Sequence, residues 1–322
     1  DDLRMKYRYL DLRRPPLQRN MILRHKMAQE IRRFLSDEGF LEIETPCLVG
    51  STPEGARDFV VPSRMSPNQF YALPQSPQLY KQMIMSTGLD RVFEIGPAFR
   101  AEPSDTVRHV SEFISFDGEM AYIDSMNDVL QMLEGCIQHV IKGVAETSSA
   151  QLEILGTEEK VPKAPYPIIE YKDAVEIVTK EGMEISLGDD LGTEGEKILG
   201  SVMEEKGYEM YWIVEYPEEA KPFYIMEKEG TPYSYSFDLD YKGQEISSGG
   251  QREHRYNVLV DRISKKGLNP DDFNFYLDAF KYGMPPHGGW GIGVERLVQK
   301  MLSLPNVREA ILFPRDRVRL VP

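Results

Sequence analysis

The sequence lacks the features that mark membrane proteins, disulfide-rich secreted proteins and zinc proteins. It has no run of about 18 apolar residues and no signal-peptide pattern, so we predict no membrane span and a cytoplasmic location. Its two cysteines, Cys47 and Cys136, form no CxxC pair, and we interpret both as buried free thiols of a reducing compartment. The five histidines are spread along the chain and predict no zinc site.

The sequence is also short of basic residues. It carries 38 Lys and Arg against 52 Asp and Glu, which gives a formal net charge of −14. That balance argues against a surface built wholly for nucleic acid, while a local basic track leading to one site stays compatible with it. Apolar residues make up 41% of the chain, enough for a substantial core. The first residue is Asp1 rather than Met, which we interpret as the start of a fragment or a processed product.

The order of the predicted elements indicates the fold class. Residues 1–20 are rich in Arg and Pro and are interpreted as a hinge or linker, and residues 21–322 as one catalytic domain. Residues 148–235 mix short helices, strands and polar loops, which we interpret as an insertion between two halves of one sheet. Runs of strands with helices around them predict an α+β fold, an antiparallel β-sheet flanked by helices.

Apolar spacing and turn residues give the individual elements. Helical spacing from Met21 to Leu35 predicts a helix that ends before Gly39, and Ser76-Pro77 predicts the start of another that runs to about Thr87. The remaining predicted helices are 125–144, 251–265, around 277–280, and 294–302. The predicted strands are 41–45, 92–99, 112–120, 236–247 and 288–293.

Two of these strands form a long-looped hairpin that is suited to phosphates. Arg100 ends the first strand, and the loop carries Arg108 and His109. Arginine presents a fork of donors that matches phosphate oxygens. On the return strand, Phe113, Ser115, Asp117 and Glu119 share one face because side chains alternate. An aromatic ring and two carboxylates there suit a flat base and an amine, although a solvated hairpin and sheet face would have the same pattern.

Three further segments carry chemistry of the same kind. Gln78 and Lys81 share a face near a helix N-terminus and could bind a small carboxylate, although most helical lysines only solvate a surface. Glu245 and Ser248 could hold a hard cation such as Mg²⁺ through oxygen. The glycine-rich strand 288–293 keeps side chains away from an approaching ligand and leads to Arg296, but it matches neither a P-loop nor GxGxxG.

Together, these segments resemble the three motifs of the class II aminoacyl-tRNA synthetases. Gly39 to Pro46 (GFLEIETP) matches the helix-and-strand motif that ends in proline. Phe99 to Glu102 (FRAE) matches the start of the second motif, and Gly293 to Arg296 (GVER) matches the end of the third. The resemblance covers essentially the whole chain and implies the class II fold.

The subtype resembled is the aspartyl one. Its signature is similar to 75–82 (QSPQLYKQ), 52–55 (TPEG), 114–117 (ISFD) and 252–255 (REHR). The family's N-terminal anticodon-binding β-barrel has no counterpart in the sequence. The stretch to about Leu73 is bacterial in style, whereas the remainder is archaeal or eukaryotic in style.

The resemblance implies that aspartate is activated with ATP and transferred to tRNA by a homodimer that assembles through the first motif. It implies catalytic roles for Arg100, Glu102 and Arg296. It implies Mg²⁺ bound by Glu245 and Ser248, and ATP bound by Arg100, Glu102, Arg108, His109, Phe113, Glu245 and Arg296. It implies aspartate bound by Glu54, Gln78, Lys81, Asp117 and Arg252.

Lys81 and Arg252 carry the expected selectivity. On this hypothesis, asparagine would leave two buried cations without an anion, at a large energetic cost. Two rival functions remain. One is a related enzyme with another activity. It would be a paralogue that amidates aspartyl-adenylate with ammonia to give asparagine, an asparaginyl-type enzyme, or a non-discriminating enzyme. The other is a regulator that has lost catalysis, against which the retained Arg100, Glu245 and Arg296 argue.

Overall fold

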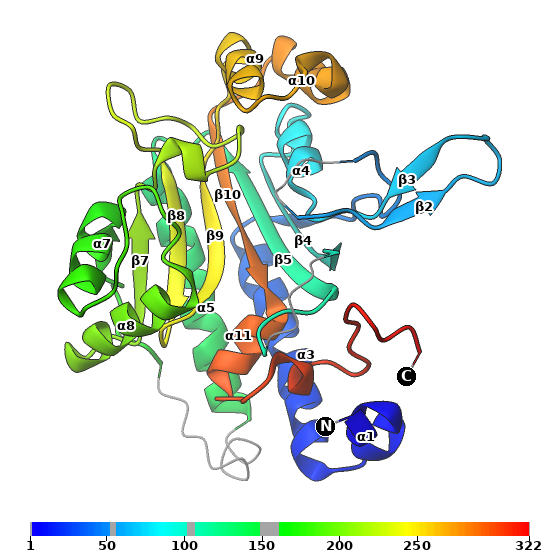
Figure 1. Cartoon of the computed structure of the whole chain (residues 1–322), viewed down its shortest axis with the longest axis vertical. Helices are drawn as coiled ribbons and strands as arrows, with labels where there is room; N and C mark the ends of the chain where they lie inside the picture. Colours follow the sequence, from blue (N-terminus) through cyan, green and yellow to red (C-terminus); the bar gives the residue numbers. More distant parts are fainter. Residues whose placement is uncertain (1, 52–55, 102–106, 149–160, 322) are drawn as a thin grey trace.

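The computed structural model describes residues 2–51, 56–101, 107–148 and 161–321, which are built around one large β-sheet (Figure 1). No helix in these ranges combines the length and the apolar character that a membrane span requires. The strands of the sheet, in spatial order, are β1 (Leu41–Glu42), β4 (Arg91–Phe99), β5 (Glu112–Ala121), β10 (His287–Gly293), β9 (Glu245–Gln251), β8 (Ser236–Tyr241), β7 (Met210–Val214) and β6 (Ile168–Glu170).

Strand pairing confirms the predicted fold class. The five pairs from β4 to β7 are antiparallel, and the two outer pairs, β1–β4 and β6–β7, are parallel. β6 and β7 come from the region predicted as an insertion, and they extend the edge of the same sheet beyond β8. The chain is therefore α+β, with an antiparallel sheet flanked by helices.

One face of the sheet is covered by two long helices, α3 (Pro15–Asp37) and α5 (Met126–Thr147), with α11 (Val294–Met301) beside them (Figure 1). Fully buried residues such as Met27 of α3 and Leu133 of α5 meet Phe116 and Trp290 of the sheet. Ser125 and Asp128 form a capping box that starts α5, which satisfies backbone N–H groups that the helix leaves unpaired.

On the opposite face, the helices that the structure describes pack in two groups, one at each side. α7 (Tyr171–Lys180) and α8 (Gly192–Glu205) pack on Tyr211 and Ile213 of β7. α4 (Gln78–Met85), α9 (Tyr256–Lys265) and α10 (Asn274–Lys281) pack around Val92 and Ala121 at the other side. The central strands β5, β10 and β9 lie between these two groups of helices.

The N-terminal segment, predicted as a hinge or linker, is largely helical. It forms α1 (Asp2–Lys6) and α2 (Arg8–Asp11), and α3 already begins at Pro15. Arg8 is buried and donates to the carbonyl oxygens of Arg308, Ile311 and Leu312. The segment is thus docked against the C-terminal part of the chain, which includes the 3-10 helix η3 (Val307–Ala310).

A small hairpin of β2 (Val60–Pro62) and β3 (Phe70–Ala72) projects away from the sheet (Figure 1). Val60 and Phe70 on this hairpin, and Leu41 on the edge strand β1, are more than half exposed. Two further 3-10 helices, η1 (Glu218–Ala220) and η2 (Pro270–Phe273), lie in connections. Exposed apolar side chains on a hairpin and an edge strand mark a surface available for association.

Three expectations were wrong. The single strand predicted at 236–247 is a hairpin of β8 and β9, because Lys242 and Gly243 both have positive φ (49° and 67°) and form the tight turn typical of antiparallel hairpins. β9 therefore runs to Gln251, and α9 starts at Tyr256 instead of 251. Of the two cysteines, Cys136 is buried as expected but Cys47 is exposed.

Candidate active site

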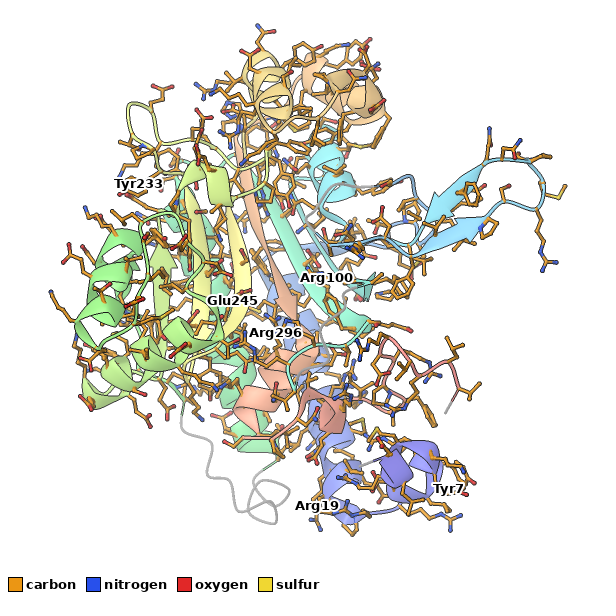
Figure 2. The ribbon with its side chains drawn as sticks, viewed as in Figure 1. Tyr7, Arg19, Arg100, Tyr233, Glu245 and Arg296 are labelled. Carbon is orange, nitrogen blue, oxygen red and sulfur yellow. The ribbon has the colours of Figure 1, made fainter. Side chains whose placement is uncertain are left out.

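A cavity of about 280 Å³ lies over the central strands of the sheet. Figure 2 shows Arg100, Glu245 and Arg296, which reach this region from the end of β4, from β9 and from α11. Lys81 lies behind the cavity wall, and Glu54 and Glu102 fall outside the residues that the structure describes. The remaining ten candidate residues line the cavity: Gln78, Arg100, Arg108, His109, Phe113, Asp117, Glu245, Ser248, Arg252 and Arg296.

The floor of the cavity is set by the alternation of β5. Phe116 and Met120 point into the core, so Phe113, Ser115 and Asp117 point into the cavity. The neighbouring strand β10 leaves room for them because it is rich in glycine. A Cβ at Gly289 would collide with the Gly118 carbonyl oxygen and the Glu119 carboxylate. The glycine-rich strand therefore makes space for charged side chains as well as for a ligand.

Cationic groups gather at one end of the cavity. The guanidinium of Arg100 lies 5.2 Å from the centre of the Phe113 ring. Arg296 Nη1 lies 3.7 Å from Glu245 Oε1, and its Nη2 lies 3.5 Å from His109 Nε2. Arg108 Nη1 lies 2.7 Å from Glu196 Oε2. Three arginines and a half-buried aromatic ring make this end of the cavity suited to a nucleoside triphosphate.

Carboxylates on β8 and β9 face these cations. Asp238 pairs with Ser248 across the two strands, and Lys221 Nζ lies 2.9 Å from Asp238 Oδ1. Burial raises the pKa of Glu245, with Asp238 adding to the shift and Arg296 opposing it. The part of the chain that the structure describes holds no group of three or more His, Cys, Asp and Glu side chains arranged for a metal ion. One carboxylate and one hydroxyl still suit Mg²⁺ that is shared with phosphates.

The other end of the cavity is an ion-pair network. Lys81 is fully buried, and its Nζ donates to Asp117 Oδ1 at 2.9 Å and to the Trp290 carbonyl oxygen at 3.0 Å. Arg252 Nε donates to Glu119 Oε1 at 3.0 Å. The expectation that these two cations would lack an anion without aspartate is therefore wrong. Each is balanced by a carboxylate of β5, because burying an unpaired charge is costly.

Two buried polar atoms in this network have no hydrogen-bond partner among the residues described. They are Gln78 Nε2 and Asp117 Oδ2, both on side chains that line the cavity. Gln78 Oε1 accepts from Arg252 Nη2 at 3.1 Å, and because arginine can only donate, the orientation of the amide is fixed. Among the residues described, the cavity wall thus offers one unpaired donor and one unpaired acceptor, which suits a carboxylate and an ammonium.

The network also fixes protonation states. Burial alone would raise the pKa of Glu119, but Arg252 and Lys81 outweigh burial, and the pKa is lowered. His287 is buried behind the network, and burial lowers its pKa to about 4. At neutral pH His287 is therefore uncharged, with Nδ1 donating to the Pro285 carbonyl oxygen and Nε2 facing Gln82.

Several side chains of the site were not predicted. Glu119 was placed on the correct face of its strand, but not as the counter-ion of Arg252. Asp238 was not predicted as a site residue because the turn at 242–243, which places it opposite Ser248, was not identified. Lys221 and Glu196 lie in the region predicted as an insertion, and no motif marks them.

Comparisons with known sequences agree with one another. The family model described as tRNA synthetases class II (D, K and N) matches residues 1–317. The chain is 52% identical over 323 residues to a protein of Pyrococcus abyssi named aspartate–tRNA(Asp) ligase, covering 100% of this chain and 73% of that protein. It is 48% identical over 322 residues to a protein of Archaeoglobus fulgidus named aspartate–tRNA(Asp/Asn) ligase, with the same coverage.

The fold is similar to that of a solved synthetase. The crystal structure of asparaginyl-tRNA synthetase from Pyrococcus horikoshii, complexed with asparaginyl-adenylate, matches with a TM-score of 0.92 and 32% sequence identity. The match covers 100% of this chain and 74% of that one. A likeness of this extent includes the central sheet and the helices that frame the cavity.

Proposed function

The chain belongs to the class II tRNA synthetases of the D, K and N group, and we propose that it acts as an aspartate–tRNA ligase. It activates L-aspartate with ATP to aspartyl-adenylate and then transfers the aspartyl group to the 3′ end of tRNA. The observation that carries the proposal is that one cavity is lined by the unpaired donor of Gln78, the unpaired acceptor of Asp117 and Arg252, which bonds Gln78. These groups form a compact amino-acid site at the opposite end of the cavity from Arg108 and Arg296.

The amino acid binds at this network. Asp117 Oδ2 accepts from the substrate's ammonium group, with Gln78 nearby and with Glu54, whose position lies outside the residues described. Arg252 lines the cavity and faces the side-chain carboxylate. Lys81 is fully buried behind the cavity wall and holds Asp117 at 2.9 Å, so it acts on the bound aspartate through Asp117. Selectivity then rests on the directions of the donors around a network that is already charge-balanced, rather than on two bare cations.

Adenylate formation needs positioning and charge neutralisation, and no covalent enzyme intermediate. The α-carboxylate of aspartate attacks the α-phosphorus of ATP in line and expels pyrophosphate. Arg100 holds the α-phosphate and the attacking carboxylate, which stabilises the charge that develops there. Phe113 lies beneath the adenine ring with Arg296 over its other face, and Glu102 reads the edge of the base. Arg108 and His109 bind the β- and γ-phosphates.

Glu245 and Ser248 would hold Mg²⁺, and Asp238 lies directly across from Ser248. The chemistry of the donor set supports this, because hard oxygen ligands beside a phosphate site suit this cation. When bound, Mg²⁺ would supply neutralisation of charge on the phosphate oxygens.

Amino-acid-dependent exchange of pyrophosphate into ATP tests the proposal without tRNA. We expect exchange with aspartate at a kcat/KM at least ~100-fold above that with asparagine, glutamate or lysine. Exchange that is best with asparagine would refute the aspartyl assignment. Exchange with none of the four amino acids would favour a regulator that has lost catalysis.

The acceptor is tested separately once adenylate forms. The Archaeoglobus relative named for both tRNA(Asp) and tRNA(Asn) makes a non-discriminating ligase the second candidate. We expect aspartate to be attached to tRNA(Asp), and charging of a tRNA(Asn) transcript at a similar rate would establish the second candidate. Formation of free asparagine from ammonia in place of aspartyl-tRNA would instead identify the amidating paralogue.

A symmetric homodimer is expected to form through the first motif, the helix-and-strand segment that α3 and β1 make up. Leu41 on β1 is 51% exposed, and Ile22 on α3 is 44% exposed, so apolar surface is available there. Sedimentation of the chain at micromolar concentration should give a single dimer. Leu41→Asp should shift the population towards monomer, whereas Leu187→Asp, a change at a more exposed leucine on the α7–α8 connection, should leave the dimer intact. A wild-type chain that sediments as a monomer would contradict this expectation.

A further inference from the structure

Glu196 of α8 joins two parts of the nucleotide end of the cavity. Its Oε2 accepts from Arg108 Nη1 at 2.7 Å and from the backbone N–H of Glu245 at 3.2 Å. Its Oε1 lies 3.4 Å from Arg108 Nη2. One carboxylate therefore ties the loop between β4 and β5 to the strand that carries Glu245.

The helix that supplies Glu196 is fixed tightly to the sheet. A Cβ at Gly200 of α8 would collide with the Cα of Gly243 in the β8–β9 turn. Lys300 Nζ of α11 donates to the carbonyl oxygen of Lys242 in the same turn at 3.0 Å. Such close backbone contact leaves little room for α8 to shift, so Glu196 is a rigid support.

Arg108 needs such a support more than the other arginines do. It lies on the loop between two strands, and a free arginine side chain has many rotamers to lose when it binds a phosphate. Glu196 is buried, and it holds one edge of the guanidinium. The guanidinium has five N–H donors, and Glu196 accepts from two of its nitrogens, Nη1 and Nη2.

We propose that Glu196 is a positioning residue that orders Arg108 towards the β- and γ-phosphates of ATP. The inference rests on the proposed ATP site. It gives the region predicted as an insertion a role in nucleotide binding. The opposite effect on ATP affinity also has a clear physical cause. If Glu196 competed with the phosphates for Arg108, removing its charge would tighten ATP binding.

Calorimetric binding of ATP and AMP to the full chain, with Mg²⁺ present, tests the proposal. Glu196→Gln should weaken ATP binding by about three- to tenfold, the usual effect of having to immobilise one long side chain on binding. AMP lacks the β- and γ-phosphates and should bind equally well to both proteins. Glu194→Gln is the matched control, because Glu194 is an exposed carboxylate on the same helix, and it should change neither affinity.

A double-mutant cycle separates positioning from general disruption of α8. In an Arg108→Gln background, Glu196→Gln should cause no further loss of ATP affinity, because the residue through which it acts is already gone. Additive losses, equal losses for AMP, an effect no larger than that of Glu194→Gln, or tighter ATP binding would each overturn the proposal. A wild-type chain that binds ATP but exchanges pyrophosphate with no amino acid would refute the proposed function, and the nucleotide comparison would still decide the role of Glu196.

Discussion

Replacing Lys81 with methionine should abolish aspartate-dependent pyrophosphate exchange and lower the free energy of unfolding by about 3–5 kcal/mol. Lys81 is fully buried, 2.9 Å from Asp117 and 3.6 Å from Glu119. Without its ammonium, two buried carboxylates share the single cation Arg252, and one of them loses its partner. Urea unfolding gives the stability, and exchange with aspartate gives the activity.

A second variant keeps this prediction testable if Lys81→Met folds poorly. Lys81→Met combined with Asp117→Asn removes both charges of the pair, so much of the lost stability should return. Activity should stay absent, because the double variant lacks both the anion that receives the ammonium group of aspartate and the buried cation that holds this anion in place. Lys142→Met is the matched control, since Lys142 pairs with Glu146 on the exposed face of α5. It should change the free energy of unfolding by no more than ~0.5 kcal/mol. A double variant that exchanges pyrophosphate at the wild-type rate would remove Lys81 and Asp117 from the aspartate site.

Local patterns were enough to predict most of the scaffold. Alternation on β5 separated Phe116, which faces the core, from Asp117, which faces the cavity. Helical spacing located α3, α5 and α11, and the glycine-rich strand β10 was found at nearly its observed length. These signals are local because each depends on the repeat of a single element.

The error at 236–247 arose because the turn residues carry a weak signal. Lys242 is an uncommon residue at positive φ, and the Lys-Gly pair is less diagnostic than Asn-Gly. The consequence for the site was large. Without the turn, β8 and β9 read as one strand, and the pairing of Asp238 with Ser248 could not be anticipated.

The charge balance of the ion-pair network at the aspartate-binding end of the cavity could not be predicted for a different reason. Lys81 and Asp117 are 36 residues apart, and Arg252 and Glu119 are 133 residues apart. Each residue type was recognised as chemically useful, but which cation meets which carboxylate depends on the order of the strands. The antiparallel pairing of β5, β10 and β9 brings Arg252 to Glu119, and the packing of α4 against β5 brings Lys81 to Asp117.

The structure of this network changes what selectivity for aspartate means. Lys81, Arg252, Asp117 and Glu119 together carry no net charge, so asparagine does not leave a pair of bare cations. Discrimination depends instead on whether the ligand's side chain can accept from the donors that face it. Arg252 only donates, and an amide offers it one acceptor oxygen where a carboxylate offers two.

Replacing Arg100 with glutamine should lower kcat for adenylate formation by about 100- to 1000-fold, the usual effect of removing one donor that stabilises charge in a transition state. Unlike Lys81, Arg100 is exposed and contacts the Phe113 ring at 5.2 Å, so its loss leaves no buried charge unpaired. The free energy of unfolding should therefore change by less than ~0.5 kcal/mol. Single-turnover measurement of aspartyl-adenylate, beside urea unfolding, gives both quantities.

Two further variants decide whether the effect comes from charge or from geometry. Arg100→Lys keeps the charge but loses the planar fork, and we expect it to recover only a small part of kcat. Arg91→Gln removes an arginine from the other end of the same strand, where Arg91 bonds the Glu38 carbonyl oxygen, and it should leave kcat unchanged. Full activity in Arg100→Lys would mean that positive charge alone suffices. Full activity in Arg100→Gln would mean that the attacking carboxylate and the α-phosphate are held elsewhere in the cavity, which Arg108, Arg252 and Arg296 also line.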